Sequence, residues 1–367
     1  MKKNPVRIIF VLIILFVLAL SVCSTTPQQK TNIIEQATGE TVFSFSQDMA
    51  DKSIMNIPKY INDLRYVNPD KFVFLLALYI SKDSRNDFRT VKRAHDWVAL
   101  NIKYDAQAYF SGSIPYQSYQ TALISGRAVC AGYADLFKKI CDELNIESKS
   151  ISGHARGYSY SLFDDESITS NHAWNMVKIY DNWYLVDCTW DSGYLEGNRS
   201  VQKYKTDYLF IKPERMIYSH FPIWQTDQLL NPPITKDEYL DMPAYKPQFF
   251  KYITEVKPNL GKITKVDGRI KINFYVNNDT NLIIQVLNAY EIETLETKKI
   301  CRLINYGNKY EAVLTFSEPG DYIVRLFSTE WLADYGMTVT SAYKPTLQET
   351  KMQEMGESLK KDMLKFK

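Results

Sequence analysis

The sequence predicts an α+β chain in which a mixed domain, with a helix packed on short antiparallel strands, is followed by an all-β sandwich. Three observations support this fold class. Apolar residues recur at helical spacing within residues 70–144. Short alternating apolar runs, separated by turn residues, fill residues 253–342. A proline-rich stretch at 231–247 lies between these two patterns and marks a domain boundary.

The composition agrees with a folded chain of about two domains. The 367 residues are 45% hydrophobic and 23% charged, which excludes a disordered or low-complexity protein. Lys and Arg number 44 against 42 Asp and Glu, so the net charge is +2. A nucleic-acid partner is not expected, because phosphate binding requires a clear basic excess on one face.

Residues 1–22 are typical of a secretory signal peptide. A basic start is followed by an uncharged apolar run from Ile8 to Leu20, which is short for a membrane-spanning helix of about 20 residues. The run ends in Leu20-Ser-Val-Cys23, which resembles the lipobox of bacterial lipoproteins and implies lipidation of Cys23. Val22 departs from that pattern, since Gly, Ala or Ser usually precedes the cysteine. Ordinary secretion and an uncleaved anchor are the alternatives, and each exports the rest of the chain.

The first domain is predicted to span residues 61–245, after a polar tether at 23–60. Helices are expected at 70–82 and 87–101, where apolar residues recur at steps of three or four. A third helix is expected to begin at Cys130. Its apolar stripe consists of Ala134, Phe137, Cys141 and Leu144. Short strands are expected from there to about residue 190.

The second domain is predicted to span residues 246–345 as an antiparallel, immunoglobulin-like sandwich. Its expected strands begin near Ile270, Leu282, Tyr310 and Tyr322, with turn residues such as Asp267-Gly268 and Glu318-Pro319-Gly320 between them. The charged tail at 346–367 is expected to form an amphipathic helix or to fray.

Cys130 is the candidate nucleophile. It follows a glycine-containing loop and precedes a helical stripe, so it should lie in the first turn of that helix. Unpaired N–H groups and the positive end of the helix dipole favour a thiolate there. The same N–H groups could stabilise the oxyanion of an attacked acyl carbon.

His172 and Asp187 are the candidate base and orienting acid. If residues 172–179 and 182–189 form a hairpin with a two-residue turn, Asp187 lies opposite Trp174 and diagonal to His172. Diagonal neighbours on one face are about 7–8 Å apart at the backbone, which an imidazole and a carboxylate can bridge. A shift of one residue would separate the two side chains onto opposite faces. An Asp that holds one ring nitrogen leaves the other to accept the thiol proton.

Each of these residues also has a structural interpretation. Cys130 could be a packed thiol, His172 a hydrogen-bonded core histidine, and Asp187 a turn or cap residue. Cys188 should point to the other face of the hairpin and lie in the core, and Cys141 lies too far along its helix to share the activation. The spacing of the cysteines matches no disulfide framework.

Three segments together resemble the transglutaminase-like superfamily, a set of papain-like folds with a Cys-His-Asp triad. They are Gly126-Arg-Ala-Val-Cys130-Ala-Gly-Tyr133, His172-Ala-Trp-Asn175 and Trp183-Tyr-Leu-Val-Asp187-Cys-Thr-Trp-Asp191. Flanking segments resemble the branch related to the kyphoscoliosis and cytokinesis proteins: His95-Asp96-Trp97, Tyr208-Leu-Phe-Ile-Lys-Pro213 and Ser219-His220-Phe221-Pro222. The resemblance covers residues 70–230. It implies a Cys-bearing helix packed on an antiparallel sheet, with Cys130 as nucleophile, His172 as general base and Asp187 as its orienting partner.

An upstream side chain usually completes the oxyanion site in this family. Tyr119 and Gln120 are candidates here, and no spacing rule selects one. Trp190 either walls the acyl site or packs. His154 is interpreted as a solvated or lid residue in a loop, and His95 as a packing or capping residue. No zinc, calcium or phosphate-loop spacing is present, so no metal or cofactor is expected.

The sequence therefore predicts an exported cysteine-dependent enzyme that transfers the acyl group of peptide or protein amides. Hydrolysis by a peptidase or amidase is favoured over crosslinking, with cell-wall peptide as one candidate substrate and the membrane as an anchoring partner. The alternative is a non-catalytic scaffold at the cell surface that keeps the fold and binds a protein or glycan.

Overall fold

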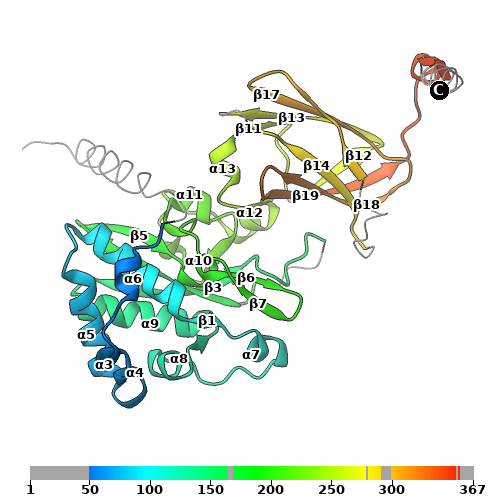
Figure 1. Ribbon diagram of the computed structural model, residues 1–367. Helices are drawn as coiled ribbons and strands as arrows, with labels where there is room; N and C mark the ends of the chain where they lie inside the picture. The colour runs from blue at the N-terminus through cyan, green and yellow to red at the C-terminus, as the bar shows by residue number, and fades with distance from the viewer. Residues whose placement is uncertain (1–48, 164–167, 278–279, 291–298, 353, 356–367) are drawn as a thin grey trace, which may run out of the picture.

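The computed structural model describes residues 49–163, 168–277, 280–290, 299–352 and 354–355 (Figure 1). The predicted signal peptide, Cys23, the start of the tether and most of the charged tail lie outside these residues. Within the described part of the chain, no helix combines the length and apolarity needed to cross a membrane.

The first domain contains the three predicted helices. The bounds are α5 Pro69–Ser81, α6 Asp87–Asn101 and α9 Cys130–Glu143. Asn68 and Asn86 cap the first two by accepting hydrogen bonds from backbone N–H groups of the first turn. Shorter helices are η1 Lys52–Met55, α3 Lys59–Asn62, α4 Leu64–Val67, α7 Ala106–Ser111, α8 Tyr119–Ser125, α10 Cys188–Ser192, α11 Pro213–Met216, η2 Gln225–Gln228 and α12 Lys236–Asp241.

A five-stranded antiparallel sheet carries the rest of this domain, in the order β8-β5-β4-β3-β9. Its strands are β3 Ser148–Ala155, β4 His172–Ile179, β5 Asn182–Val186, β8 Leu209–Ile211 and β9 His220–Pro222. Two small pairs accompany it: β1 Lys103–Tyr104 with β2 Arg127–Ala128, and β6 Gly193–Glu196 with β7 Arg199–Gln202.

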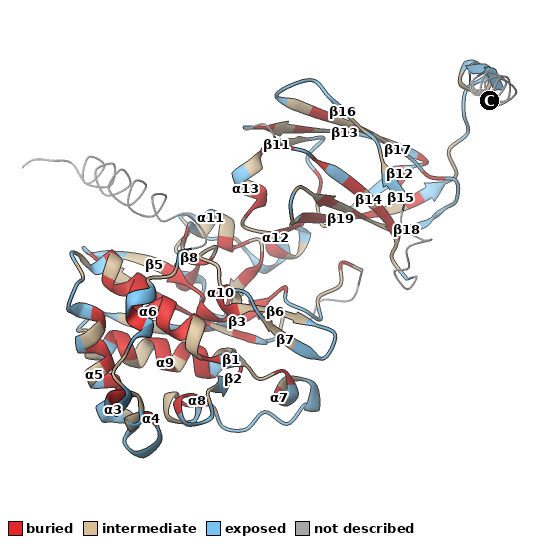
Figure 2. Cartoon of the chain, in the orientation of Figure 1, coloured by how far each residue is buried: buried red, intermediate tan, exposed pale blue. Residues whose placement is uncertain are grey.

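Helix α9 packs on this sheet through the predicted apolar stripe. Tyr133, Phe137 and Ile140 of α9 share one buried cluster with Val177 of β4 and Trp97 of α6. Figure 2 shows these buried segments between the helices and the sheet. The structure therefore has the predicted arrangement of a cysteine-bearing helix on an antiparallel sheet.

The β4–β5 hairpin has the predicted register. Asn175 pairs with Val186 and Ile179 with Asn182, across a turn formed by Tyr180 and Asp181. Both turn residues have positive φ, 48° and 67°, as a two-residue hairpin turn that follows the strand twist requires.

The predicted tether at 23–60 is wrong for its last ten residues. Ile54 is fully buried in the core of the first domain, and the Asp51 N–H donates to the Asp96 carboxylate at 2.9 Å. Because η1 and α3 have a weak apolar pattern, the sequence does not indicate that they pack on the domain.

The second domain is a sandwich of two sheets. One has the order β10-β19-β18-β14-β15, and its strand β19 also pairs with β12. The other has the order β11-β13-β17-β16. The strands are β10 Ala244–Tyr245, β11 Ile253–Lys257, β12 Ile263–Asp267, β13 Arg269–Val276, β14 Ile283–Asn288, β15 Lys299–Cys301, β16 Leu303–Asn305, β17 Lys309–Thr315, β18 Gly320–Phe327 and β19 Trp331–Ser341; helix α13 Phe249–Tyr252 precedes β11.

Two details differ from the sequence prediction. Strand β12 pairs with β19 in parallel, so the sandwich is not entirely antiparallel. Ala244 of β10 already pairs with Asp334 of β19, and the sandwich sheet therefore begins two residues before the predicted boundary at 246. The chain enters the sandwich through α12, which lies between the two domains in Figure 1.

Candidate active site

Cys130 is the first residue of α9, as predicted, and its side chain is half-buried. Val129 precedes the helix and provides no side-chain cap. Among the described residues, nothing accepts a hydrogen bond from the N–H groups of Cys130 and Ala131. These two donors at the helix start are available to an oxyanion beside the sulfur.

His172 begins β4, and Asp187 directly follows β5 as the N-cap of α10; the two side chains meet on one face of the hairpin. His172 Nε2 and Asp187 Oδ2 are 2.7 Å apart, a charge-assisted hydrogen-bond distance. Asp187 is fully buried, and its Oδ1 accepts the backbone N–H groups of Thr189 and Trp190 at the start of α10. The hydrogen bond through Nε2 leaves Nδ1 of the imidazole for Cys130.

The three groups shift one another's pKa values. Burial alone would lower the pKa of His172, but the charges of Asp187 and Cys130 raise it to about 10. Burial raises the pKa of the Cys130 thiol, yet the charge and hydrogen bond of His172 and the Ala173 N–H outweigh this, so the thiol pKa falls below its usual value. The pKa of Asp187 is also lowered: the His172 charge outweighs the burial. These shifts all favour a thiolate–imidazolium pair beside a carboxylate.

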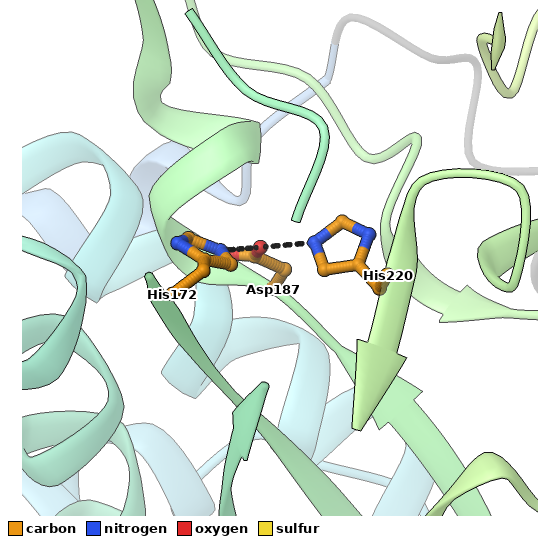
Figure 3. Close-up of side chains that lie close together, drawn as sticks. All are labelled: His172, Asp187 and His220. Carbon is orange, nitrogen blue, oxygen red and sulfur yellow. Dashed lines mark hydrogen bonds and ion pairs between the residues drawn. The ribbon is translucent and has the colours of Figure 1, made fainter. Parts of the chain in front are cut away.

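His220 is a second imidazole at the site, and Figure 3 shows that it lies on the other side of Asp187 from His172. Its Nε2 is 3.2 Å from the same Asp187 Oδ2, and its Nδ1 is 2.8 Å from the Ser219 hydroxyl. Burial lowers the pKa of His220 to about 4, so the ring is neutral and donates its one N–H to the carboxylate. It is a positioning residue that the sequence pattern does not predict, although it lies within the flanking segment 219–222.

A close strand approach brings His220 to the site. A Cβ on Gly153 of β3 would lie 2.4 Å from the Phe221 carbonyl oxygen of β9, so only glycine fits there. The edge strand β9 can therefore pair with β3 beside His172.

The structure does not place the predicted oxyanion donors, Tyr119 and Gln120, beside Cys130. The Tyr119 ring lies 5.7 Å from Lys139 Nζ and its hydroxyl donates to Asp70, so it lies along the later turns of α9, away from Cys130. No described contact brings Gln120 to the sulfur. Gln117 does reach the start of α9, where its Oε1 accepts the Val129 N–H at 3.1 Å. Tyr119 is therefore a wrong prediction, and Gln117 is an upstream side chain that reaches the start of α9.

Trp190 forms a wall of the site. Its ring centroid lies 4.3 Å from that of His220 and 5.4 Å from that of His172. It also lines a cavity of about 1070 Å³ together with His172 and Tyr104. Cys130 does not line this cavity itself, but it lies next to His172 and Tyr104, which do.

A buried ionic network lies behind the site. His95 Nε2 is 3.0 Å from Asp191 Oδ2, and its Nδ1 is 3.2 Å from Asp96 Oδ1. Burial would lower the pKa of His95, but the two carboxylates raise it to about 9. Asp191 belongs to α10, the helix that Asp187 caps. His95 thus packs as predicted, and it joins α6 to the helix that carries the site.

His154 was predicted in a solvated loop or lid, and this prediction is wrong. It lies in β3, is buried, and its Nδ1 is 3.2 Å from the Tyr239 hydroxyl. Because β3 continues through the polar run at 153–155, the sequence pattern hides the strand.

His172, Asp187 and His220 offer three potential metal ligands within 4.8 Å of one another. Two ligands of a tetrahedral site with bonds of about 2.0 Å would be separated by about 3.3 Å. The 2.7 Å separation of His172 and Asp187 instead fits a direct hydrogen bond. The imidazole of His172 is also engaged by Cys130, so this cluster fits acid–base chemistry better than metal binding.

The other described cysteines differ from Cys130. Cys141 and Cys188 are buried in the core, and burial raises the pKa of each. Cys301 is half-buried in the sandwich, where burial also raises its pKa. All four are free thiols, and only the Cys130 pKa is lowered.

Comparison with known proteins matches part of the chain to a family. Residues 76–188 match the family model described as the transglutaminase-like superfamily. This part of the chain is a transglutaminase-like domain, and it contains α6, α9 and the β4–β5 hairpin.

The chain is similar to kyphoscoliosis peptidase of Mus musculus, at 26% identity over 59% of this chain and 33% of that protein. It is also similar to Cytokinesis protein 3 of Saccharomyces cerevisiae, at 27% identity over 32% of this chain and 13% of that protein. A crystal structure of a TGase matches at 18% identity and a TM-score of 0.27, over 46% of this chain and 40% of that one. The matches with the two named relatives cover a third or less of their length.

Proposed function

We propose that the protein is a cysteine-dependent acyl-transfer enzyme that acts on peptide or protein amides and releases the acyl group to water. The observation that carries the proposal is the junction of three groups: a helix-start thiol with a lowered pKa, an imidazole beside it, and a carboxylate 2.7 Å from that imidazole. Membership of the domain in a superfamily with cysteine chemistry supports it.

In the first half-reaction the Cys130 thiolate attacks the amide carbonyl carbon and forms a C–S bond. The carbonyl oxygen becomes an oxyanion facing the N–H groups of Cys130 and Ala131, where one donor typically lowers the barrier by about 3–4 kcal/mol. The His172 imidazolium then gives its Nδ1 proton to the leaving nitrogen. The C–N bond breaks, the amine departs, and a thioester remains.

In the second half-reaction neutral His172 takes a proton from water, and the oxygen attacks the thioester carbon. The C–S bond breaks, the carboxylic acid leaves, and the thiolate–imidazolium pair is restored. Asp187 holds the ring through Nε2 throughout and keeps Nδ1 directed at the sulfur. Water needs no second binding site, which favours hydrolysis over attack by a protein amine.

Export and lipid anchoring are part of the proposal and depend on residues 1–23 alone. Labelled fatty acid should be incorporated into the full-length protein in a bacterial host and should be lost from Cys23→Ala. Retained label in that variant would contradict anchoring at Cys23.

The experiment that tests the enzymatic proposal compares protein termini after incubation of an extract with wild type, Cys130→Ala and Cys301→Ala. Hydrolysis predicts new free N-termini with wild type and with Cys301→Ala, and none with Cys130→Ala. New isopeptide links instead of new termini would replace hydrolysis by crosslinking. Identical profiles for all three proteins would overturn the enzymatic proposal and favour a non-catalytic scaffold.

A further inference from the structure

The cavity beside the site lies between the two domains. The transglutaminase-like domain contributes His172, Trp190 and Tyr208, and the sandwich contributes Arg325 and Trp331. The second domain is therefore a wall of the same cavity into which the catalytic imidazole faces.

Polar contacts hold this wall in place. Lys205 of the first domain pairs with Glu330 of the sandwich at 2.6 Å. Within the sandwich, the N–H of Lys246 donates to the Leu332 carbonyl at 2.9 Å, which continues the β10–β19 pairing. The buried Arg156 guanidinium donates to the carbonyls of Tyr239 and Met242 in the connecting segment, at 2.7 and 2.8 Å. These contacts fix the positions of the residues that line the cavity, so the cavity has a defined shape.

The charges of the cavity are unbalanced. Six basic side chains and three acidic ones line it. Lys205 and Arg325 each pair with a carboxylate, Glu330 and Asp334 respectively. Lys246, by contrast, forms no ion pair with any described residue.

Lys246 lies between two indole rings at the domain boundary. Its Nζ is 4.4 Å from the ring centroid of Trp331 and 5.8 Å from that of Trp190. Burial lowers the pKa of this ammonium, with Arg325 and Lys205 adding to the effect and Asp334 opposing it. The ammonium of Lys246 is partly desolvated and has aromatic rings beside it. A carboxylate that enters the cavity would stabilise its charge by a charge-assisted hydrogen bond.

We infer that the cavity between the domains binds a peptide that carries a carboxylate, and that Lys246 receives this carboxylate. The inference rests on the proposed function for the choice of a peptide, since the cavity adjoins an amide-cleaving site. Trp190 contacts both Lys246 and His172, so one indole ring separates the carboxylate from the catalytic imidazole. At about 3.3 Å per extended residue, the acidic group lies within a few residues of the attacked amide.

The test measures binding to a protein that cannot turn the peptide over. Cys130→Ala protein is titrated with blocked hexapeptides in an alanine host, each with one Glu or the isosteric Gln at a single position. Quenching of tryptophan fluorescence gives the dissociation constants. Three additional variants are made in the Cys130→Ala background: Lys246→Gln, Lys246→Arg, and Lys265→Gln as a matched exposed lysine on the sandwich.

The inference predicts at least about tenfold tighter binding of a Glu peptide than of its Gln partner at one or two adjacent positions, the discrimination typical of one charge-assisted hydrogen bond. Lys246→Gln should abolish this preference, and Lys246→Arg and Lys265→Gln should keep it. Equal binding of Glu and Gln peptides, or a preference that survives Lys246→Gln, would overturn the inference. Because binding is measured without catalysis, failure of this inference can be distinguished from failure of the proposed hydrolysis. If only the hydrolysis is wrong, the preference for Glu peptides persists while wild type cleaves no peptide.

Discussion

Asp187 is the residue on which the site depends most. It is fully buried and accepts hydrogen bonds from two imidazoles through one oxygen and from two backbone N–H groups through the other. Every acceptor position of the carboxylate is thus directed at a donor. An amide of the same shape cannot reproduce this arrangement, because one of its two atoms must donate.

Asp187→Asn should therefore abolish most of the activity. The amide loses the negative charge that raises the pKa of His172, and it places an NH₂ group against an imidazole or against the backbone donors of α10. We expect kcat/KM to fall by about 10³–10⁴-fold, as for an orienting carboxylate in a triad. Steady-state kinetics on a cleaved peptide measures this. Asp181→Asn, an exposed turn residue of the same hairpin, should be unaffected; equal losses in both variants would contradict the assigned role.

Residue patterns were sufficient to predict that Cys130, His172 and Asp187 lie together. They were not sufficient to predict the residues around these three. Cys130 could be placed because a loop glycine and an apolar stripe define the start of its helix. His172 and Asp187 could be placed because a two-residue turn allows only one register with both on the same face. His220 could not, since its edge strand is three residues long and depends on the space left by Gly153.

Helix α10 is the element that couples the site to the rest of the domain. Asp187 caps its first turn, and Asp191 near its end pairs with His95 of α6. The imidazolium of His95 thus stabilises the helix that holds the orienting carboxylate.

His95→Gln should destabilise the protein in a pH-dependent way. The pKa of His95 is about 9 in the folded state and about 6.5 in the unfolded state. Its contribution to stability is therefore fully present below pH 6.5 and is lost as the pH rises through 9. We expect the substitution to cost on the order of 3 kcal/mol at pH 6 and clearly less at pH 9.5, measured by urea unfolding at both values. A cost independent of pH would show that His95 is not charged in the fold.

Helices whose apolar residues recur at regular helical spacing could be predicted from the sequence. Elements with a weak apolar pattern could not. Helices α5, α6 and α9 begin and end within a residue or two of their predicted bounds, because their apolar stripes are long and two of them are capped by Asn. The sequence predicts a tether through residue 60, because the two single-turn helices η1 and α3 leave no periodic signal. The pairing of β12 with β19 in parallel depends on contacts between distant segments, which local alternation does not encode.

At the scale of the whole molecule, the connecting segment sets the position of the sandwich over the site. Arg156 is buried in the first domain and binds the carbonyl oxygens of Tyr239 and Met242. A buried guanidinium with several carbonyl acceptors holds the segment more firmly than a neutral side chain can.

Arg156→Gln should weaken the attachment of the connecting segment to the first domain. The carbonyls of the connecting segment lose their charged donor, so local opening of residues 235–247 becomes more frequent. We expect thermolysin to cleave this segment on the order of tenfold faster or more, the ratio that corresponds to about 1.4 kcal/mol. Arg269→Gln, which removes a surface pair with Glu349, serves as the control. Unchanged cleavage in Arg156→Gln would mean that the sandwich is held by other contacts.

The central claim is that His172 lowers the pKa of the Cys130 thiol, and the rate of alkylation by iodoacetamide as a function of pH tests it most directly. Peptide mapping after short exposures follows each cysteine separately. We expect labelling of Cys130 to rise at a lower pH than the usual thiol value near 9, and Cys301 in the same sample to react only at higher pH. In His172→Ala, Cys130 should react like an ordinary thiol. A wild-type Cys130 profile that rises only near pH 9 and matches that of His172→Ala would contradict it.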